Sequence, residues 1–240
     1  MLRLNVIQKT GLAAVLLNAV LAWGAGSYSI EPAKISSSVP KNITNDLDPS
    51  GVLLFTSGTG VKEEICTIFW AKTTAAAAAP SAEVGYSSIR EGALVGVIHL
   101  FREATEDYDV DFNDQKLKPG YYTMRYAVQP AGTGEHGPIA GDFVVLSPIA
   151  MDSDPDRVLS KDEMLRFGKL VSNGNEAARM QLVPVEDSKD TAPGVTTDGS
   201  GSAIVHFKMH LAVTKGAPAQ QLNVDLTVVT PKPDLGRNSS

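Results

Sequence analysis

A glycine-rich segment in the middle of the chain holds the residues best suited to acid–base chemistry. Glu135 and His136 lie in the sequence GTGEHGPIAG, and Asp142 follows shortly after it. An imidazole beside two carboxylates can act as a general base in hydrolysis, or can bind a metal ion. The glycines are also typical of a tight connection between two strands. The sequence therefore leaves a catalytic cluster and a simple turn open, and it favours the turn.

A second group of acids has the spacing of a calcium-binding loop. The twelve-residue stretch DSDPDRVLSKDE carries acids at positions 1, 3, 5 and 12, the positions that ligate calcium in an EF-hand: Asp152, Asp154, Asp156 and Glu163. Arg157 occupies the sixth position, where the sharp turn of an EF-hand requires glycine. The competing interpretation is an acidic turn followed by a helix, because Ser160 and Glu163 match a capping box. Calcium is the only cofactor that the sequence suggests.

The remaining reactive side chains favour structural roles. Cys66 is the single cysteine and lies in the apolar run EICTIFWAK, which predicts a buried thiol and excludes an internal disulfide. His206 and His210 share one face of an alternating strand with Lys208, so we expect both histidines to face solvent. Their Cα atoms would be about 13 Å apart, too far to hold one metal ion together.

The elements around these residues are mainly strands. Alternation in YYTMRYAV places Tyr122, Met124, Tyr126 and Val128 on one face, which we expect in the core. GDFVVLSP is predicted as the next strand of a hairpin. The segment that starts at Ser160 and ends at Asn173 and Gly174 has helical spacing. The alanine-rich stretch 73–83 contains Pro80 and predicts a surface loop. We therefore predict a mainly β protein, an immunoglobulin-like β-sandwich of about eight strands with one short α-helix.

The first residues have the features of an export signal. Arg3 and Lys9 precede thirteen uncharged residues and then the small residues of AWGAGS, which predicts a secretory signal peptide in 1–25. The apolar run is too short for a stable membrane span, which needs about 20 residues. We expect one β-sandwich domain in 26–232, a disordered tail in 233–240, and an exported protein of the periplasm or the extracellular space.

The net charge of the chain limits the classes of partner that it can bind. Loss of Arg3 and Lys9 with the signal peptide lowers the number of Lys and Arg from 21 to 19, against 27 Asp and Glu. A surface with this excess of acids repels phosphate backbones, so nucleic acid is not expected as a partner. An unidentified small ligand or a protein partner is compatible with the composition.

Three motifs carry a resemblance to a known group of proteins. GALVGVI, KPGYYTMRY and DFVVLSP, followed by a D-P segment and a short helix, resemble an uncharacterised family of secreted bacterial proteins. The PG-x-Y turn is also similar, more weakly, to immunoglobulin-like and carboxypeptidase-regulatory-like domains. The resemblance covers residues 64–184 and implies export and a β-sandwich. The chain departs from it at the alanine-rich stretch and at GTGEHGPIAG.

Two hypotheses about function follow from these patterns. The first is an exported binding or structural module, which would hold its ligand in loops at the ends of the strands. The loops that suit this role span 103–118, 132–142 and 152–163. The second is a metal-dependent or hydrolytic enzyme centred on His136 with Glu135 and Asp142. The positions of these three side chains distinguish the two hypotheses.

Overall fold

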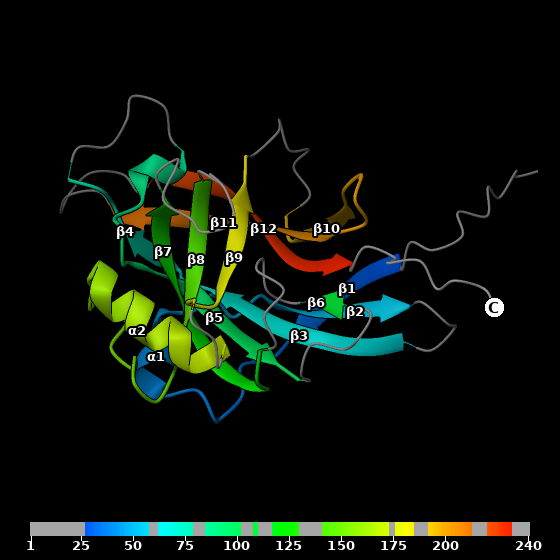
Figure 1. The fold of residues 1–240 in the computed structure, drawn as a ribbon, viewed down its shortest axis with the longest axis horizontal. Coiled ribbons are helices and arrows are strands. Elements are labelled where there is room, and N and C mark those ends of the chain that lie inside the picture. Colours follow the sequence, from blue (N-terminus) through cyan, green and yellow to red (C-terminus); the bar gives the residue numbers. More distant parts are fainter. Residues whose placement is uncertain are drawn as a thin grey trace, which may run out of the picture.

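The protein is described here by a computed structural model, which shows a mainly β chain (Figure 1). The structure describes residues 27–57, 62–78, 85–101, 108–109, 117–129, 141–172, 176–184, 192–212 and 220–231. The expected signal peptide and the expected tail lie outside these ranges, so both stay predictions. No helix within the described ranges has the length and apolar character needed to cross a bilayer.

Strands make up most of the described elements. In chain order, these are β1 (Ser27–Ala33), α1 (Lys41–Asp46), β2 (Gly51–Ser57), β3 (Lys62–Trp70), β4 (Thr73–Ala75), a 3₁₀ turn (Tyr86–Ser88), β5 (Leu94–Leu100), β6 (Tyr108–Asp109), β7 (Gly120–Gln129), β8 (Gly141–Pro148), α2 (Lys161–Ser172), β9 (Arg179–Val183), β10 (Gly194–Thr197), β11 (Ala203–Ala212) and β12 (Gln220–Pro231). The expected hairpin of β7 and β8 and the expected helix α2 are both confirmed.

The strands belong to one hydrogen-bonded sheet. Its order is β1-β2-β3-β5-β7-β8-β9-β12-β11-β10, with β4 paired to β11 and β6 to β12, and every neighbouring pair along the main order is antiparallel. The end strands β1 and β10 contact each other, so the sheet curls round on itself. The prediction of a mainly β, antiparallel fold is confirmed. The described strands outnumber the expected eight and form a continuous sheet, where two separate ones were expected.

The main core fills the inside of this curled sheet. Trp70 on β3 stacks on Phe207 on β11, with ring centroids 5.3 Å apart, although the two strands are far apart in the sheet order. Tyr122, Met124 and Tyr126 point into the same core, as their alternation predicts. The prediction is wrong for Val128, which lies near the end of β7 and is exposed. Cys66 is also fully buried there, and burial raises the pKa of its thiol. Its role is therefore the expected one of a small buried side chain.

The two helices cover the outer face of the central strands. Ile43 and Leu47, in and just after α1, pack on Phe69 of β3 and Val97 of β5. In Figure 1, α2 lies across β8. Phe167 of α2 packs with Val145 of β8. Neither helix covers the outer face of β10, β11 and β12, which lie at the other end of the sheet.

Two local predictions differ from the structure. The sequence predicts one short helix, but the described residues contain two α-helices. The six-residue α1 forms because Ile43 and Leu47 are completely buried against the sheet, and such packing stabilises helices too short to persist alone. The start of the alanine-rich stretch is β4, whose Thr74 is buried and donates a hydrogen bond to the Leu94 carbonyl.

Candidate functional site

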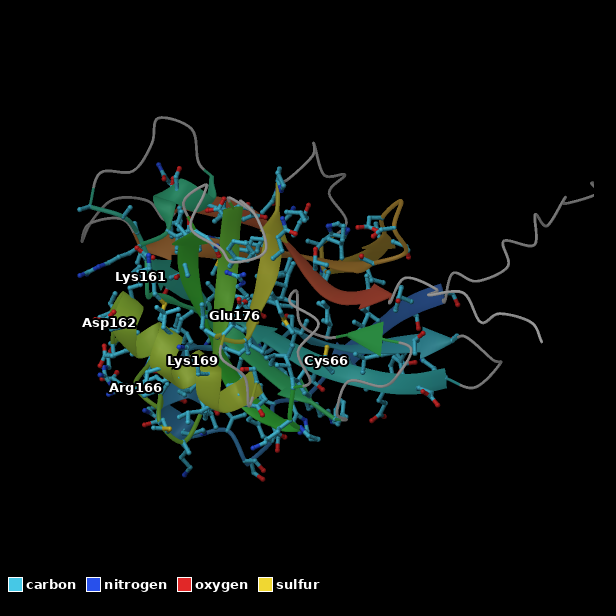
Figure 2. The ribbon with its side chains drawn as sticks, in the orientation of Figure 1. Cys66, Lys161, Asp162, Arg166, Lys169 and Glu176 are labelled. Carbon is cyan, nitrogen blue, oxygen red and sulfur yellow. The ribbon has the colours of Figure 1, made fainter. Side chains whose placement is uncertain are left out.

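A groove opens between α2 and the outer face of β7, β8 and β9. Its cavity volume is about 380 Å³, and it is lined by residues of both layers: Glu91, Ala127, Val128, Gln129, Phe143, Val145, Lys161, Met164, Leu165, Lys169, Glu176, Ala177 and Arg179. A volume of a few hundred cubic ångströms is typical of small-molecule sites. Figure 2 shows α2 with Lys161 and Lys169 beside this face of the sheet, and Glu176 near the strands.

A capping box fixes the start of the helix that forms one wall. Oε2 of Glu163 accepts hydrogen bonds from the backbone N–H of Ser160 at 3.0 Å and from its hydroxyl at 2.9 Å. The Glu163 N–H donates back to the Ser160 hydroxyl at 3.4 Å. These bonds with Ser160 lower the pKa of Glu163, because they stabilise its ionised form. The helix predicted from this motif therefore begins where the motif places it.

A glycine on α2 sets how closely the helix approaches the sheet. A Cβ atom added at Gly168 would lie 2.6 Å from Cβ of Ala177 and 3.0 Å from Cγ1 of Val145. The Gly168 carbonyl also accepts a hydrogen bond from the Ala178 N–H at 3.2 Å. The C-terminal half of α2 is therefore held tightly, and the groove lies alongside this contact.

The groove exposes apolar side chains that the core does not use. Val128 is 42% exposed and Leu165 is 43% exposed, although both are large hydrophobic residues. Phe143 and Met164 line the same cavity and are buried. A ligand that covers Val128 and Leu165 would remove apolar surface from water, which is the main favourable term in binding of this kind.

Charged side chains surround this apolar surface. Lys161, Leu165 and Lys169 are four residues apart on α2, so they form one row along the helix. On the sheet side, the guanidinium of Arg179 lies over the Phe143 ring, 5.1 Å from its centroid, and pairs with Glu176 at 3.8 Å. The two lysines therefore give the helix side of the groove a positive rim.

The acids of the EF-hand pattern point in different directions. Asp152 is buried and forms a two-bond ion pair with Arg125: Nε donates to Oδ2 at 2.7 Å and Nη2 to Oδ1 at 2.6 Å. The Asp154 carboxylate instead accepts from the Asp156 N–H at 3.1 Å, and Glu163 pairs with Arg157.

Arg125 also donates hydrogen bonds to backbone carbonyl groups of the loop that carries Asp152. Its guanidinium donates to the carbonyl oxygens of Arg157 at 2.6 Å and of Asp154 at 2.8 Å. Thr123 donates its hydroxyl proton to Asp152. Within the described part of the chain, no three His, Cys, Asp or Glu side chains are grouped so that they could hold a metal ion. The arrangement agrees with the competing interpretation, a turn that leads into a capped helix.

The other predicted cluster is only partly described. Glu135 and His136 lie outside the described residues, so the enzyme hypothesis stays a prediction. Asp142 is half-buried at the start of β8, and its Oδ1 accepts a hydrogen bond from the Tyr126 hydroxyl at 2.5 Å. Burial and this bond both raise the pKa of Tyr126. The loops 103–118 and 132–142 are likewise mostly outside the described ranges.

The histidines on β11 differ from each other. His210 is exposed, as expected, but His206 is half-buried and its Nδ1 lies 2.7 Å from Oδ1 of Asp225. On β5, His99 stacks on Tyr121 with centroids 3.9 Å apart, and burial lowers its pKa. Sequence patterns gave no sign of the His206–Asp225 pair, because strand register determines it.

The groove was not among the sites predicted from the sequence. Its helix side was visible in principle, because Leu165 breaks the polar face of α2 between two lysines at helical spacing. Its sheet side was not, because Val128 is in phase with the core residues of β7 and its position predicts a buried side chain. Comparisons of the chain with protein-family models, with curated proteins and with solved structures gave no match.

Proposed function

We propose that the protein is an exported binding module, and that its ligand is a small anionic amphiphile held in the groove between α2 and the sheet. The observation that carries this is the row Lys161–Leu165–Lys169 facing an open apolar cavity that also exposes Val128. Export is supported by the charge and hydropathy pattern of residues 1–25 and by the resemblance to secreted bacterial proteins. The same resemblance implies a β-sandwich, and we propose this architecture together with the function.

The ligand chemistry follows from the walls of the groove. An acyl chain that lies against Val128, Leu165 and Phe143 would be shielded from water. A carboxylate at the rim would meet the ammonium group of Lys161 or that of Lys169, which lie eight residues apart on α2. The Arg179–Glu176 pair lies on the sheet side and largely balances its own charge. A fatty acid of medium chain length combines these two properties.

Titration calorimetry with decanoate tests this proposal on the full chain. We expect one site, with weaker binding of the cationic analogue decyltrimethylammonium. Leu165→Gln should weaken decanoate binding about tenfold, equivalent to about 1.4 kcal/mol, because the chain loses an apolar contact. Leu170→Gln is the matched control, since Leu170 is 50% exposed on the same helix and does not line the cavity.

The charged rim has its own matched pair of variants. Lys161→Gln should weaken decanoate binding at low ionic strength and have less effect at high salt, because salt screens exposed charges. Arg166→Gln should leave binding unchanged, since Arg166 carries the same charge on the same helix but does not line the groove. Absence of binding heat, or equal losses for Leu165→Gln and Leu170→Gln, would contradict the proposal.

A further inference from the structure

The outer face of β10, β11 and β12 carries a row of polar residues on three adjacent strands. On β11, Val205, Phe207 and Met209 point into the core, so the residues between them point outward. His206 on this outer face is directly opposite Asp225 of β12 in the strand register. On the other side, His206 is opposite Gly194 of β10, which has no side chain to occupy the space beside the imidazole.

Two hydrogen bonds join this row into a continuous chain. Nδ1 of His206 lies 2.7 Å from Oδ1 of Asp225, and Nε2 lies 2.7 Å from the hydroxyl oxygen of Thr196 on β10. Because an ionised carboxylate only accepts hydrogen bonds, the ring proton belongs on Nδ1. Nε2 is then the acceptor for the Thr196 hydroxyl proton. A hydroxyl, an imidazole and a carboxylate are thus connected in the order that activates a nucleophile.

Exposure to solvent increases from the carboxylate through the imidazole to the hydroxyl, as expected where the hydroxyl has to reach a substrate. Side-chain exposure is 8% for Asp225 and 19% for His206, and Thr196 is exposed. The backbone at Asp225 is also fixed, since its N–H donates to the Tyr86 hydroxyl at 2.9 Å. That hydroxyl donates in turn to the Val183 carbonyl at 2.8 Å. The carboxylate that orients the imidazole is therefore buried and held, while the hydroxyl can meet a substrate.

We propose that Thr196 is a nucleophile for small carboxylic esters, with His206 as its general base and Asp225 as a positioning residue. Oγ1 of Thr196 bonds to the ester carbonyl carbon while its proton passes to Nε2 of His206. The bond from that carbon to the leaving alkoxide then breaks, and the alcohol departs with the proton from His206. Water, deprotonated by His206, cleaves the acyl–Thr196 ester, which releases the acid and restores the hydroxyl.

Thr196 lies on a strand at the end of the sheet order. β10 is the last strand of the sheet order, and within the described residues its register pairs it with β11 only. Every second backbone N–H of such an edge strand points away from its ladder partner. On that side β10 contacts β1, but no strand pairing joins the two within the described residues, so an N–H beside Thr196 that points that way would be the donor to a tetrahedral oxyanion. This site shares no residue with the groove beside α2.

A covalent probe tests the site directly. A small alkyl phosphonofluoridate should form a bond between phosphorus and the Thr196 oxygen with loss of fluoride, which peptide mapping by mass spectrometry detects. Thr196→Val should abolish the label, and Thr196→Ser should retain it. Thr197→Val is the matched control, because Thr197 is the next residue on the same strand and is also exposed; its label should be that of the wild-type chain.

The roles of the partners need kinetic measurements. His206→Gln should slow labelling about 100-fold, which is a typical contribution of a general base. Asp225→Asn should slow hydrolysis of p-nitrophenyl acetate and change its pH profile, a readout that a purely structural role would not affect. Thermal melting establishes that each variant is folded. The proposal is overturned if Thr196 takes no label, or if folded His206→Gln is labelled at the wild-type rate.

Discussion

Replacement of Asp152 by asparagine should destabilise the protein more than any exposed charge change. Asp152 and Arg125 have side-chain exposures of 0%, and their two-bond pair lies beneath the loop that leads into α2. Asparagine keeps the shape but removes the charge, so the Arg125 guanidinium stays buried without its anion. The carbonyl oxygens of Asp154 and Arg157 still accept from Arg125, but they do not neutralise it.

The burial of the pair sets the size of the expected loss in the free energy of unfolding. Removing one partner of a buried ion pair costs about 3–5 kcal/mol, because the other charge is left uncompensated. Exposed pairs contribute about 0–1 kcal/mol. Glu31→Gln is therefore the matched control, since Glu31 pairs with Lys62 and the side chains of both are about half exposed, at 54% and 41%. The difference between the two variants should exceed about 2 kcal/mol.

Urea denaturation followed by circular dichroism measures both free energies of unfolding. The midpoint of Asp152→Asn should fall sharply with little change in slope, and that of Glu31→Gln should stay close to wild type. In a third variant, Arg125→Met with Asp152→Leu, the lost pair is replaced by apolar groups, and part of the stability should return. A loss below about 1 kcal/mol for Asp152→Asn would refute the account of this loop.

Three further predictions concern single contacts. Gly168→Ala should lower the free energy of unfolding by about 1–3 kcal/mol, because the new methyl group overlaps its neighbours, while Gly85→Ala, with no atom within 4 Å of the added Cβ, should be nearly neutral in the same urea titration. Tyr86→Phe should cost about 1–3 kcal/mol, since it leaves buried backbone groups of β9 and β12 without their bridge. Ser160→Ala should destabilise α2 and remove part of the acid sensitivity of the protein, measured by melting at a series of pH values.

The sign of the acid effect follows from Glu163. Its pKa is lower in the folded chain than its ordinary value, because of its bonds with Ser160. The stabilisation is therefore present above the pKa of the unfolded chain and is lost as the pH falls through the folded pKa. A Ser160→Ala melting curve that keeps the full wild-type acid sensitivity would contradict this cause. For Tyr86→Phe the control is Tyr122→Phe, which removes a hydroxyl with one carbonyl partner and should cost less.

Local patterns identified several of the elements but not their pairing. Alternation in β7 correctly identified Tyr122, Met124 and Tyr126 as core residues, but it also placed the exposed Val128 among them. The Ser160–Glu163 motif identified the start of α2. These signals lie within a few residues of each other in the chain. The stack of Trp70 on Phe207 joins residues of strands that are distant in sequence, so no local pattern predicts that the sheet curls round.

The candidate sites likewise depend on contacts between residues that are distant in the sequence. The EF-hand spacing of Asp152 and its neighbours was real, but Arg125, on a strand 27 residues away, redirects that carboxylate into the interior. The His206–Asp225 pair likewise depends on the register of β11 with β12, which the sequence of either strand alone does not specify. Long-range partners, and not the acids and histidines themselves, determine what these residues do.

Methyl NMR of the full chain with decanoate tests the proposed function most directly. Val128, Met164 and Leu165 line the groove, whereas Met209 and Leu211 lie in the core on β11. The account predicts saturable shifts of the groove methyl signals, with those of β11 unchanged. Shifts spread over both sets, or confined to signals away from α2 and β7, would contradict a ligand site in the groove.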